Sequence, residues 1–147
     1  MRGVDVSIFN DPVDWHALKD AGIEFAICRT GYGKNGVDET FQRNVDGAHK
    51  VGMVCGAYHY SYAMTPADAV IEADFCKRII EESGVLLELP VWFDMEDDDG
   101  TSVATALTSA AKTLPTSAAL FSITSSRLTA VSTQVTRGLK IISIGAI

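Results

Sequence analysis

Strand-like and helix-like segments alternate through positions 3 to 100, and this alternation restricts the fold more than any other feature. Short apolar runs rich in β-branched residues are each followed by a run with apolar residues at helical spacing. Repeated strand–helix units favour a parallel sheet. We therefore predict an α/β fold, either half of a (β/α)₈ barrel or one wing of an open doubly wound sheet. The expected strands are 4–9, 24–29, 53–60 and 86–96.

Proline, glycine and capping residues mark the helices between these strands. Pro12 lies near the start of the first helix, and Thr65 followed by Pro66 opens the third and longest. The expected helices occupy roughly 13–22, 41–51 and 65–83. The strand ends after Phe9, Arg29, Tyr60 and Glu96 then converge on one rim, where folds of this kind keep their chemistry.

The last of these strands carries two carboxylates at its C-terminal end. Because strand side chains alternate, Asp94 and Glu96 point the same way, about 6.6 Å apart along the strand. Such a pair can cleave a glycosidic bond, with one acid protonating the leaving oxygen and the other group meeting the positive charge on the sugar. We expect Glu96 to be the acid. The alternatives are that the acidic run 96–99 forms a solvated loop or a hard-cation site.

Asp5 is a carboxylate inside the first expected strand. Its neighbours Val4 and Val6 are apolar, and its position predicts that it faces the same rim as Asp94. The alternative is a helix cap, a role for which Asn10 and Asp11 are better placed.

Aromatic residues gather near the same rim. Tyr58, Tyr60 and Tyr62 recur at period two and so share a face, with Trp92 on the neighbouring strand and Tyr32 on a nearby loop. Flat amphipathic side chains suit the apolar faces and hydroxyl edges of sugar rings. The alternative is an aromatic ladder in the core, which applies most to Tyr58.

Other polar motifs give weaker indications. Arg29 either orients a carboxylate, binds the polar edge of a sugar, or forms a structural ion pair. The segment 31–36 lacks the spacing and the Lys-Ser/Thr ending of a phosphate loop, so a glycine turn is favoured. His16, His49 and His59 have no metal-ligand spacing.

Composition excludes several classes of protein. A net charge of −7 argues against nucleic acid as a partner, and no apolar run approaches the roughly 18 residues that span a bilayer. The first residues lack the pattern of a secretory signal, so we expect no export by the general pathway. Cys28, Cys55 and Cys76 are expected to be buried thiols, because an odd number cannot complete a disulfide framework.

The composition changes abruptly after Gly100. All 19 acidic residues lie in 1–100, whereas 101–147 holds 17 Ser or Thr and a single aromatic residue, Phe121. A helix over 103–112 and a short strand within 139–147 are the only elements that the pattern suggests there. We therefore divide the chain into 1–100, which carries the expected site, and an atypical tail, 101–147, without an expected native-like structure.

Four segments, taken together and in order, resemble glycoside hydrolase family 25, the lysozymes (N-acetylmuramidases) of bacteria and their phages. They are Gly3-Val4-Asp5-Val6-Ser7, Phe25-Ala26-Ile27-Cys28-Arg29-Thr30-Gly31-Tyr32-Gly33, Gly56-Ala57-Tyr58-His59-Tyr60-Ser61 and Pro90-Val91-Trp92-Phe93-Asp94-Met95-Glu96. The resemblance covers roughly residues 1 to 98. It implies the N-terminal half of an irregular, TIM-like β/α barrel, and cleavage of the β-1,4 bond between N-acetylmuramic acid and N-acetylglucosamine in peptidoglycan.

The resemblance also implies roles for individual residues. Glu96 becomes the general acid, and Asp94 and Asp5 stabilise charge or position the substrate. A substrate-assisted route is expected, with the N-acetyl group as internal nucleophile and Asp94 orienting it. The implied partners are peptidoglycan glycan strands of the bacterial cell wall, acted on by a monomer without a metal or other cofactor. The alternative is a degenerate relative that binds the wall without hydrolysis.

The tail departs from the family pattern, as a truncation or a shifted reading frame after about residue 100 would produce. Read two bases out of register with permissible synonymous codons, 123–147 can encode a Tyr-, Asn- and Gly-rich segment. A half barrel leaves the edges of its first and fourth strands unpaired. We therefore predict low stability and weak activity unless the tail covers these edges. The coding DNA tests the frame shift.

Overall fold

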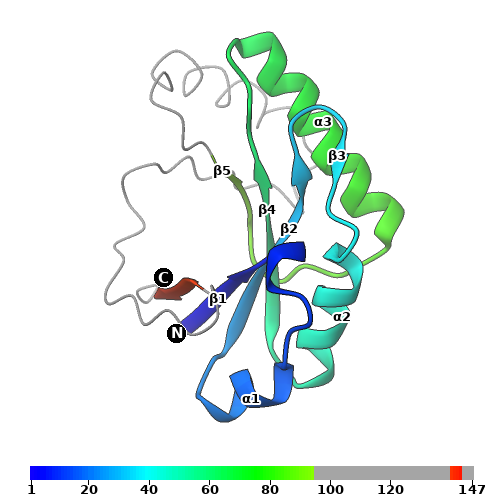
Figure 1. Cartoon of the computed structure of the whole chain (residues 1–147). Coiled ribbons are helices and arrows are strands. Elements are labelled where there is room, and N and C mark those ends of the chain that lie inside the picture. Colours follow the sequence, from blue (N-terminus) through cyan, green and yellow to red (C-terminus); the bar gives the residue numbers. More distant parts are fainter. Residues whose placement is uncertain (95–139, 144–147) are drawn as a thin grey trace.

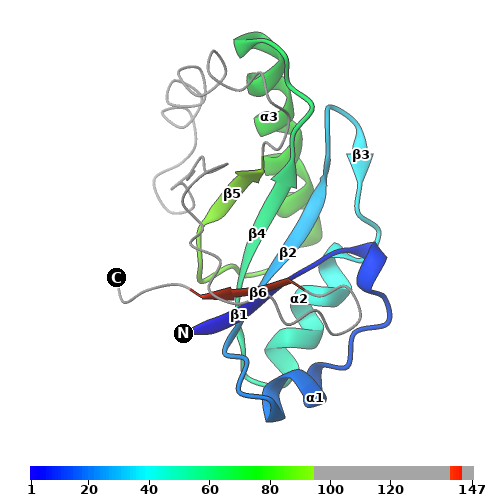
Figure 2. The same cartoon turned by 60° about the vertical axis from the view of Figure 1, so that its left-hand side comes forward.

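A computed structural model describes residues 1–94 and 140–143, and these residues form one sheet with helices packed on one side (Figure 1). The strand order is β5-β4-β2-β1-β6, and β3 pairs with β2 off this path. Strands β1, β2, β4 and β5 are parallel, whereas β6 runs antiparallel to β1 (Figure 2). The strands are β1 (Arg2–Val6), β2 (Phe25–Tyr32), β3 (Gly36–Val37), β4 (Val54–Tyr60), β5 (Val91–Asp94) and β6 (Lys140–Ser143).

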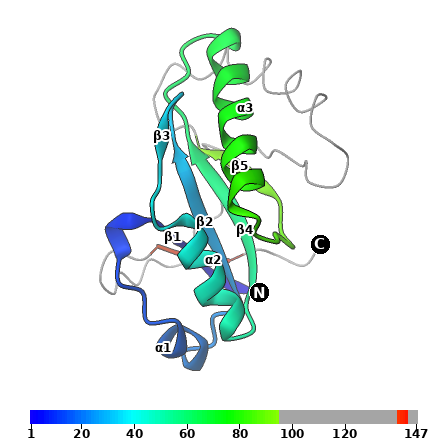
Figure 3. The same cartoon turned by 90° about the vertical axis from the view of Figure 1, so that its right-hand side faces the viewer.

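Helices connect the parallel strands, as the alternating pattern predicts. Both α2 and α3 lie on the same face of the sheet (Figure 3). The helical elements are a 3₁₀ turn, η1 (Ile8–Asn10), and the helices α1 (Trp15–Asp20), α2 (Phe41–Lys50) and α3 (Pro66–Ser83). The α/β fold class is confirmed. None of the helices in residues 1–94 is long and apolar enough to cross a membrane.

The main hydrophobic core lies between the sheet and these helices. Val4 and Val6 of β1 belong to it, together with Val45 of α2 and Phe75 of α3, all almost inaccessible to solvent. The three cysteines are buried and free, which confirms the expectation of buried thiols. Because side chains alternate along a strand, Asp5 must leave this core and point to the other face of the sheet.

The ends of α3 follow from local sequence. The Thr65 hydroxyl accepts a hydrogen bond from the backbone N–H of Asp68, and Pro66 fills the first helical position, where its missing N–H is not needed. Gly84 ends the helix in the left-handed region, with φ of 65°. The first helix differs from its prediction, because Asp14 caps it and it therefore begins three residues after Pro12.

Several strand boundaries differ from the prediction, and β2 continues to Tyr32 instead of ending at Arg29. The first strand ends at Val6, not at Phe9, because Ser7 and Asn10 form a capping box that starts η1. The last strand begins at Val91, not at Leu86. The backbone N–H groups of the preceding residues, Glu88 and Leu89, donate instead to the Cys55 carbonyl near the start of β4.

The glycine turn expected over 31–36 forms the tip of the β2–β3 hairpin. At Gly31 an added Cβ would lie 2.1 Å from the Gly36 carbonyl oxygen, so any side chain would force the hairpin apart. We expect Gly31→Ala to lower the free energy of unfolding by about 1–3 kcal/mol, measured by urea unfolding. Gly52→Ala is the control, because Gly52 has φ of 71° but open space around it, so only backbone strain is added. An equal or smaller loss for Gly31→Ala would contradict the steric explanation.

The chain beyond Gly100 contributes a strand to the sheet. Residues 140–143 form β6, within the apolar segment 139–147, and pair with β1 in the register Arg2 to Ser143 and Asp5 to Lys140. The tail therefore covers the edge of β1, one of the two edges that a half barrel alone would leave unpaired. The short strand expected within 139–147 is confirmed. The expected helix over 103–112 lies outside the described residues.

Candidate active site

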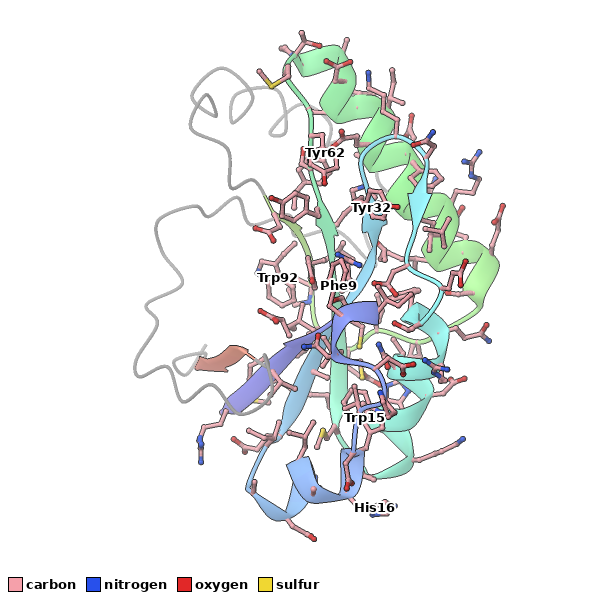
Figure 4. The ribbon with its side chains drawn as sticks, in the orientation of Figure 1. Phe9, Trp15, His16, Tyr32, Tyr62 and Trp92 are labelled. Atoms are coloured by element: carbon pink, nitrogen blue, oxygen red, sulfur yellow. The ribbon has the colours of Figure 1, made fainter. Side chains whose placement is uncertain are left out.

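The face of the sheet opposite α2 and α3 carries most of the side chains predicted for the site. On β1, β2, β4 and β5 the residues that alternate with the core residues point to this face, and Trp92 is seen there in Figure 4. The structure thus brings together, from four neighbouring strands, Asp5 of β1, Arg29 of β2, Tyr58 and Tyr60 of β4, and Trp92 and Asp94 of β5.

Tyr58 lies at the centre of this group. It is in register with Arg29 on one side and Trp92 on the other, while Tyr60 is in register with Asp94. Burial raises the pKa of Tyr58 well above its usual range, and the charges of Asp5 and Asp94 raise it further, whereas Arg29 partly offsets them. The Tyr58 phenol is therefore protonated at neutral pH, and it interacts electrostatically with the carboxylates of both Asp5 and Asp94.

The end of β5 is fixed by a buried carboxylate that the sequence analysis missed. The carbonyl oxygen of Asp94 accepts a hydrogen bond from the Ser61 N–H at 2.8 Å. The Ser61 hydroxyl donates to Glu72 of α3 at 2.7 Å, and Glu72 also accepts from the Tyr62 N–H. Burial raises the pKa of Glu72, although these two hydrogen bonds partly oppose the shift. Glu72 thus connects α3 to the segment that supports Asp94.

The aromatic residues at the carboxyl ends of the strands are in mutual contact. The ring centroids of Tyr60 and Tyr62 are 5.2 Å apart, and those of Tyr62 and Tyr32 are 6.3 Å apart. Tyr62 and Tyr32 are exposed. A register shift between Arg29 and Gly31 brings Tyr32 opposite Tyr60 on β4. As a result, Tyr32 and Arg29 lie near each other at this end of the sheet, although they are an odd number of positions apart along β2.

Arg29 forms the structural ion pair that was one of its predicted alternatives. Its Nε lies 2.8 Å from the Oδ2 of Asp38, and both side chains are buried. Asp38 also accepts hydrogen bonds from the Ile8 N–H and from the N–H and hydroxyl of Thr40. Burial raises the pKa of Asp38, but these hydrogen bonds together outweigh it and the pKa is lowered. Nothing in the sequence pattern distinguishes Asp38 from an exposed loop aspartate.

His59 of β4 lies on the face of the sheet that packs against α3, and it fixes the β2–β3 hairpin. Its Nε2 donates to the Gly33 carbonyl at 2.8 Å, its Nδ1 lies 2.9 Å from the Thr30 hydroxyl, and its ring stacks on Phe93. Burial lowers its pKa to about 4, with a smaller contribution from Arg29. The imidazole is therefore neutral in the folded protein at neutral pH.

Acid should destabilise the fold through His59. An unfolded chain protonates this histidine near pH 6.5, whereas the folded chain does so near 4, so stability is present above pH 6.5 and is lost as the pH falls toward 4. We expect a loss of about 2 kcal/mol from this group between pH 7 and pH 4.5, measured by urea unfolding. His59→Gln is the control, and an unchanged pH dependence in this variant would contradict the assignment.

The remaining predicted site residue, Glu96, lies outside the described residues, as does the rest of the acidic run 96–99. Within the described residues, no group of three or more His, Cys, Asp and Glu side chains is arranged to hold a metal ion.

Comparison with known proteins gives one consistent result. The pattern of the family described as "Glycosyl hydrolases family 25" matches residues 4–128, a region that extends past Gly100. The autolytic lysozyme of Clostridium acetobutylicum is 31% identical over 103 residues, which cover 70% of this chain and 30% of that protein.

Two solved structures have the same fold over 76% of this chain. One is the modular autolysin LytC from Streptococcus pneumoniae in complex with a synthetic peptidoglycan ligand, at 20% identity and a TM-score of 0.63 over 29% of its length. The other is a family 25 glycosyl hydrolase from Bacillus anthracis, at 24% identity and a TM-score of 0.62 over 54% of its length. The chain thus spans between about a third and a half of these relatives.

Proposed function

Because this chain belongs to glycosyl hydrolase family 25, we propose that it carries the catalytic strands of a lysozyme-type glycoside hydrolase that cleaves peptidoglycan. The observation that supports this most directly is the grouping of Asp5 and Asp94 around Tyr58 on the face of the sheet that α2 and α3 leave uncovered. The names of two relatives, an autolytic lysozyme and an autolysin in complex with a peptidoglycan ligand, support peptidoglycan as the substrate.

The proposed site residues divide by chemistry. Glu96 is the general acid, and Asp94 and Asp5 are the assisting carboxylates. Tyr58 stays protonated and can therefore donate a hydrogen bond to the substrate beside both of them. Tyr60, Tyr62, Tyr32 and Trp92 offer aromatic surface to the sugar rings. These residues come from 1–100, which we propose to be the part of the chain that carries the active site.

The proposed reaction breaks the bond between C1 of N-acetylmuramic acid and the oxygen of the following sugar. Glu96 gives its proton to that oxygen while the N-acetyl carbonyl oxygen of the muramic acid bonds to C1. Asp94 orients the N-acetyl group and stabilises the positive charge that it gains. Water then attacks C1, gives a proton back to Glu96 and restores the N-acetyl group. With this substrate, the protein acts on the bacterial cell wall.

Purified peptidoglycan tests the proposal. We expect the full chain to bind it and to release reducing ends, with a fall in the turbidity of a wall suspension. Binding without release of reducing ends would contradict hydrolysis and would favour a wall-binding relative. Release that is lost in chelator would contradict a mechanism that depends on carboxylates alone.

A further inference from the structure

Phe9 is the most exposed large apolar side chain in the part of the chain that the structure describes. It is 83% exposed, compared with 57% for Tyr62 and 42% for Tyr32. An aromatic ring in water forgoes the favourable burial that it would find in a core. The exposure therefore has a cost, which a ligand that covers the ring would offset.

The position of Phe9 is fixed although its ring is exposed. It is the middle residue of η1, whose capping box joins Ser7 and Asn10. The preceding N–H, of Ile8, donates to the buried carboxylate of Asp38 at 3.0 Å. The guanidinium carbon of Arg29 lies over the Phe9 ring, 4.9 Å from its centroid. The ring is thus held on a rigid support, and most of its surface stays accessible.

Phe9 extends a series of aromatic side chains that begins beside Asp94. We call Tyr60, Tyr62, Tyr32 and Phe9 the aromatic row. Tyr60 is in register with Asp94, and its ring contacts Tyr62, which contacts Tyr32. The Arg29 guanidinium lies near both Tyr32, at 5.7 Å, and Phe9. Phe9, Tyr32 and Tyr62 follow one another in the view of Figure 4.

Such a row suits a linear polysaccharide. Each sugar ring of a glycan strand has an apolar face that stacks on an aromatic ring, and successive sugars need successive platforms. We infer that Phe9 is a binding platform for a pyranose ring of the peptidoglycan strand, at the end of the aromatic row away from Asp94. This inference rests on the proposed function and adds a substrate-binding position on η1 that neither the motifs nor the carboxylate site contains.

The test compares three variants of the full chain in a co-sedimentation assay with purified peptidoglycan. We expect Phe9→Ala to weaken binding about threefold to tenfold, the range measured for contacts between aromatic groups. Phe9→Trp should bind at least as well as the unmodified chain, because it keeps the flat ring. Leu86→Ala, which removes another exposed apolar side chain (69% exposed), should leave binding unchanged.

The outcomes separate the two proposals. Equal binding by Phe9→Ala and the unmodified chain would overturn the role of Phe9 while leaving hydrolysis intact. A fall in thermal stability or a change of oligomeric state in Phe9→Ala, without weaker binding, would also overturn it, since the ring would then pack against protein. If the unmodified chain neither binds peptidoglycan nor releases reducing ends, the proposed function fails and the inference fails with it.

Discussion

Replacing Glu96 with Gln should reduce the release of reducing ends from peptidoglycan by about 10²–10⁴-fold, the contribution of a positioned general acid. Glutamine keeps the size and much of the polarity of the side chain but has no proton to give to the leaving oxygen. Binding to the wall should therefore persist while kcat falls. The measurement is the initial rate of reducing-end release, together with co-sedimentation of the same variant.

Two further substitutions show whether this effect is specific. Asp97→Asn removes a carboxylate from the same acidic run and should leave the rate nearly unchanged, because the proposed mechanism gives Asp97 no role. Asp94→Asn should lower the rate, because an amide cannot stabilise the charge of the N-acetyl group. Comparable losses for Asp97→Asn and Glu96→Gln would indicate a general role for the acidic run and would contradict a single acid.

Removing the Asp38 carboxylate should cause a large loss of stability. Asp38→Ala leaves the Arg29 guanidinium buried without its partner and removes the acceptor for Ile8 and Thr40. Breaking one side of a buried ion pair typically costs about 3–5 kcal/mol. We expect a loss of this size in the free energy of unfolding, measured by urea unfolding at neutral pH.

An exposed ion pair provides the matched control. Asp11 pairs with Arg43, whose side chain is 64% exposed, so Asp11→Ala should cost less than about 1 kcal/mol. Similar losses for the two substitutions would show that the Asp38 network is no stronger than a surface contact. The Asp38 variant should also weaken binding to peptidoglycan, because the network holds η1 and therefore Phe9.

Much of the fold could be predicted from local pattern. The helix over 66–83 follows from Thr65, Pro66 and the apolar stripe, and its limits in the structure agree with the prediction. The end of the first strand differs from its prediction because residues 7–9 suit either an extended strand or a 3₁₀ turn. The capping box of Ser7 and Asn10 favours the turn. The last strand begins later than predicted, because an apolar run does not show where its backbone hydrogen bonds go.

Pairing between distant segments could not be predicted in this way. The strand at 140–143 is visible only as a short apolar run, and its antiparallel pairing with β1 depends on contacts across more than 130 positions of sequence. The register shift near Arg29 is likewise invisible, because it arises from how β2 fits β4. That shift is what brings Tyr32 opposite Tyr60.

The sequence by itself determined the α/β class, the family resemblance, and the alternation that turns Asp5, Tyr58 and Asp94 away from the core. These depend on periodicity and motif order, which are properties of neighbouring residues. Only the tertiary structure decided that Asp38 neutralises Arg29, that Glu72 supports the end of β5, and that Phe9 stands exposed on a fixed support. Each of these depends on a buried charge or an exposed ring, and burial is set by which distant segments pack together.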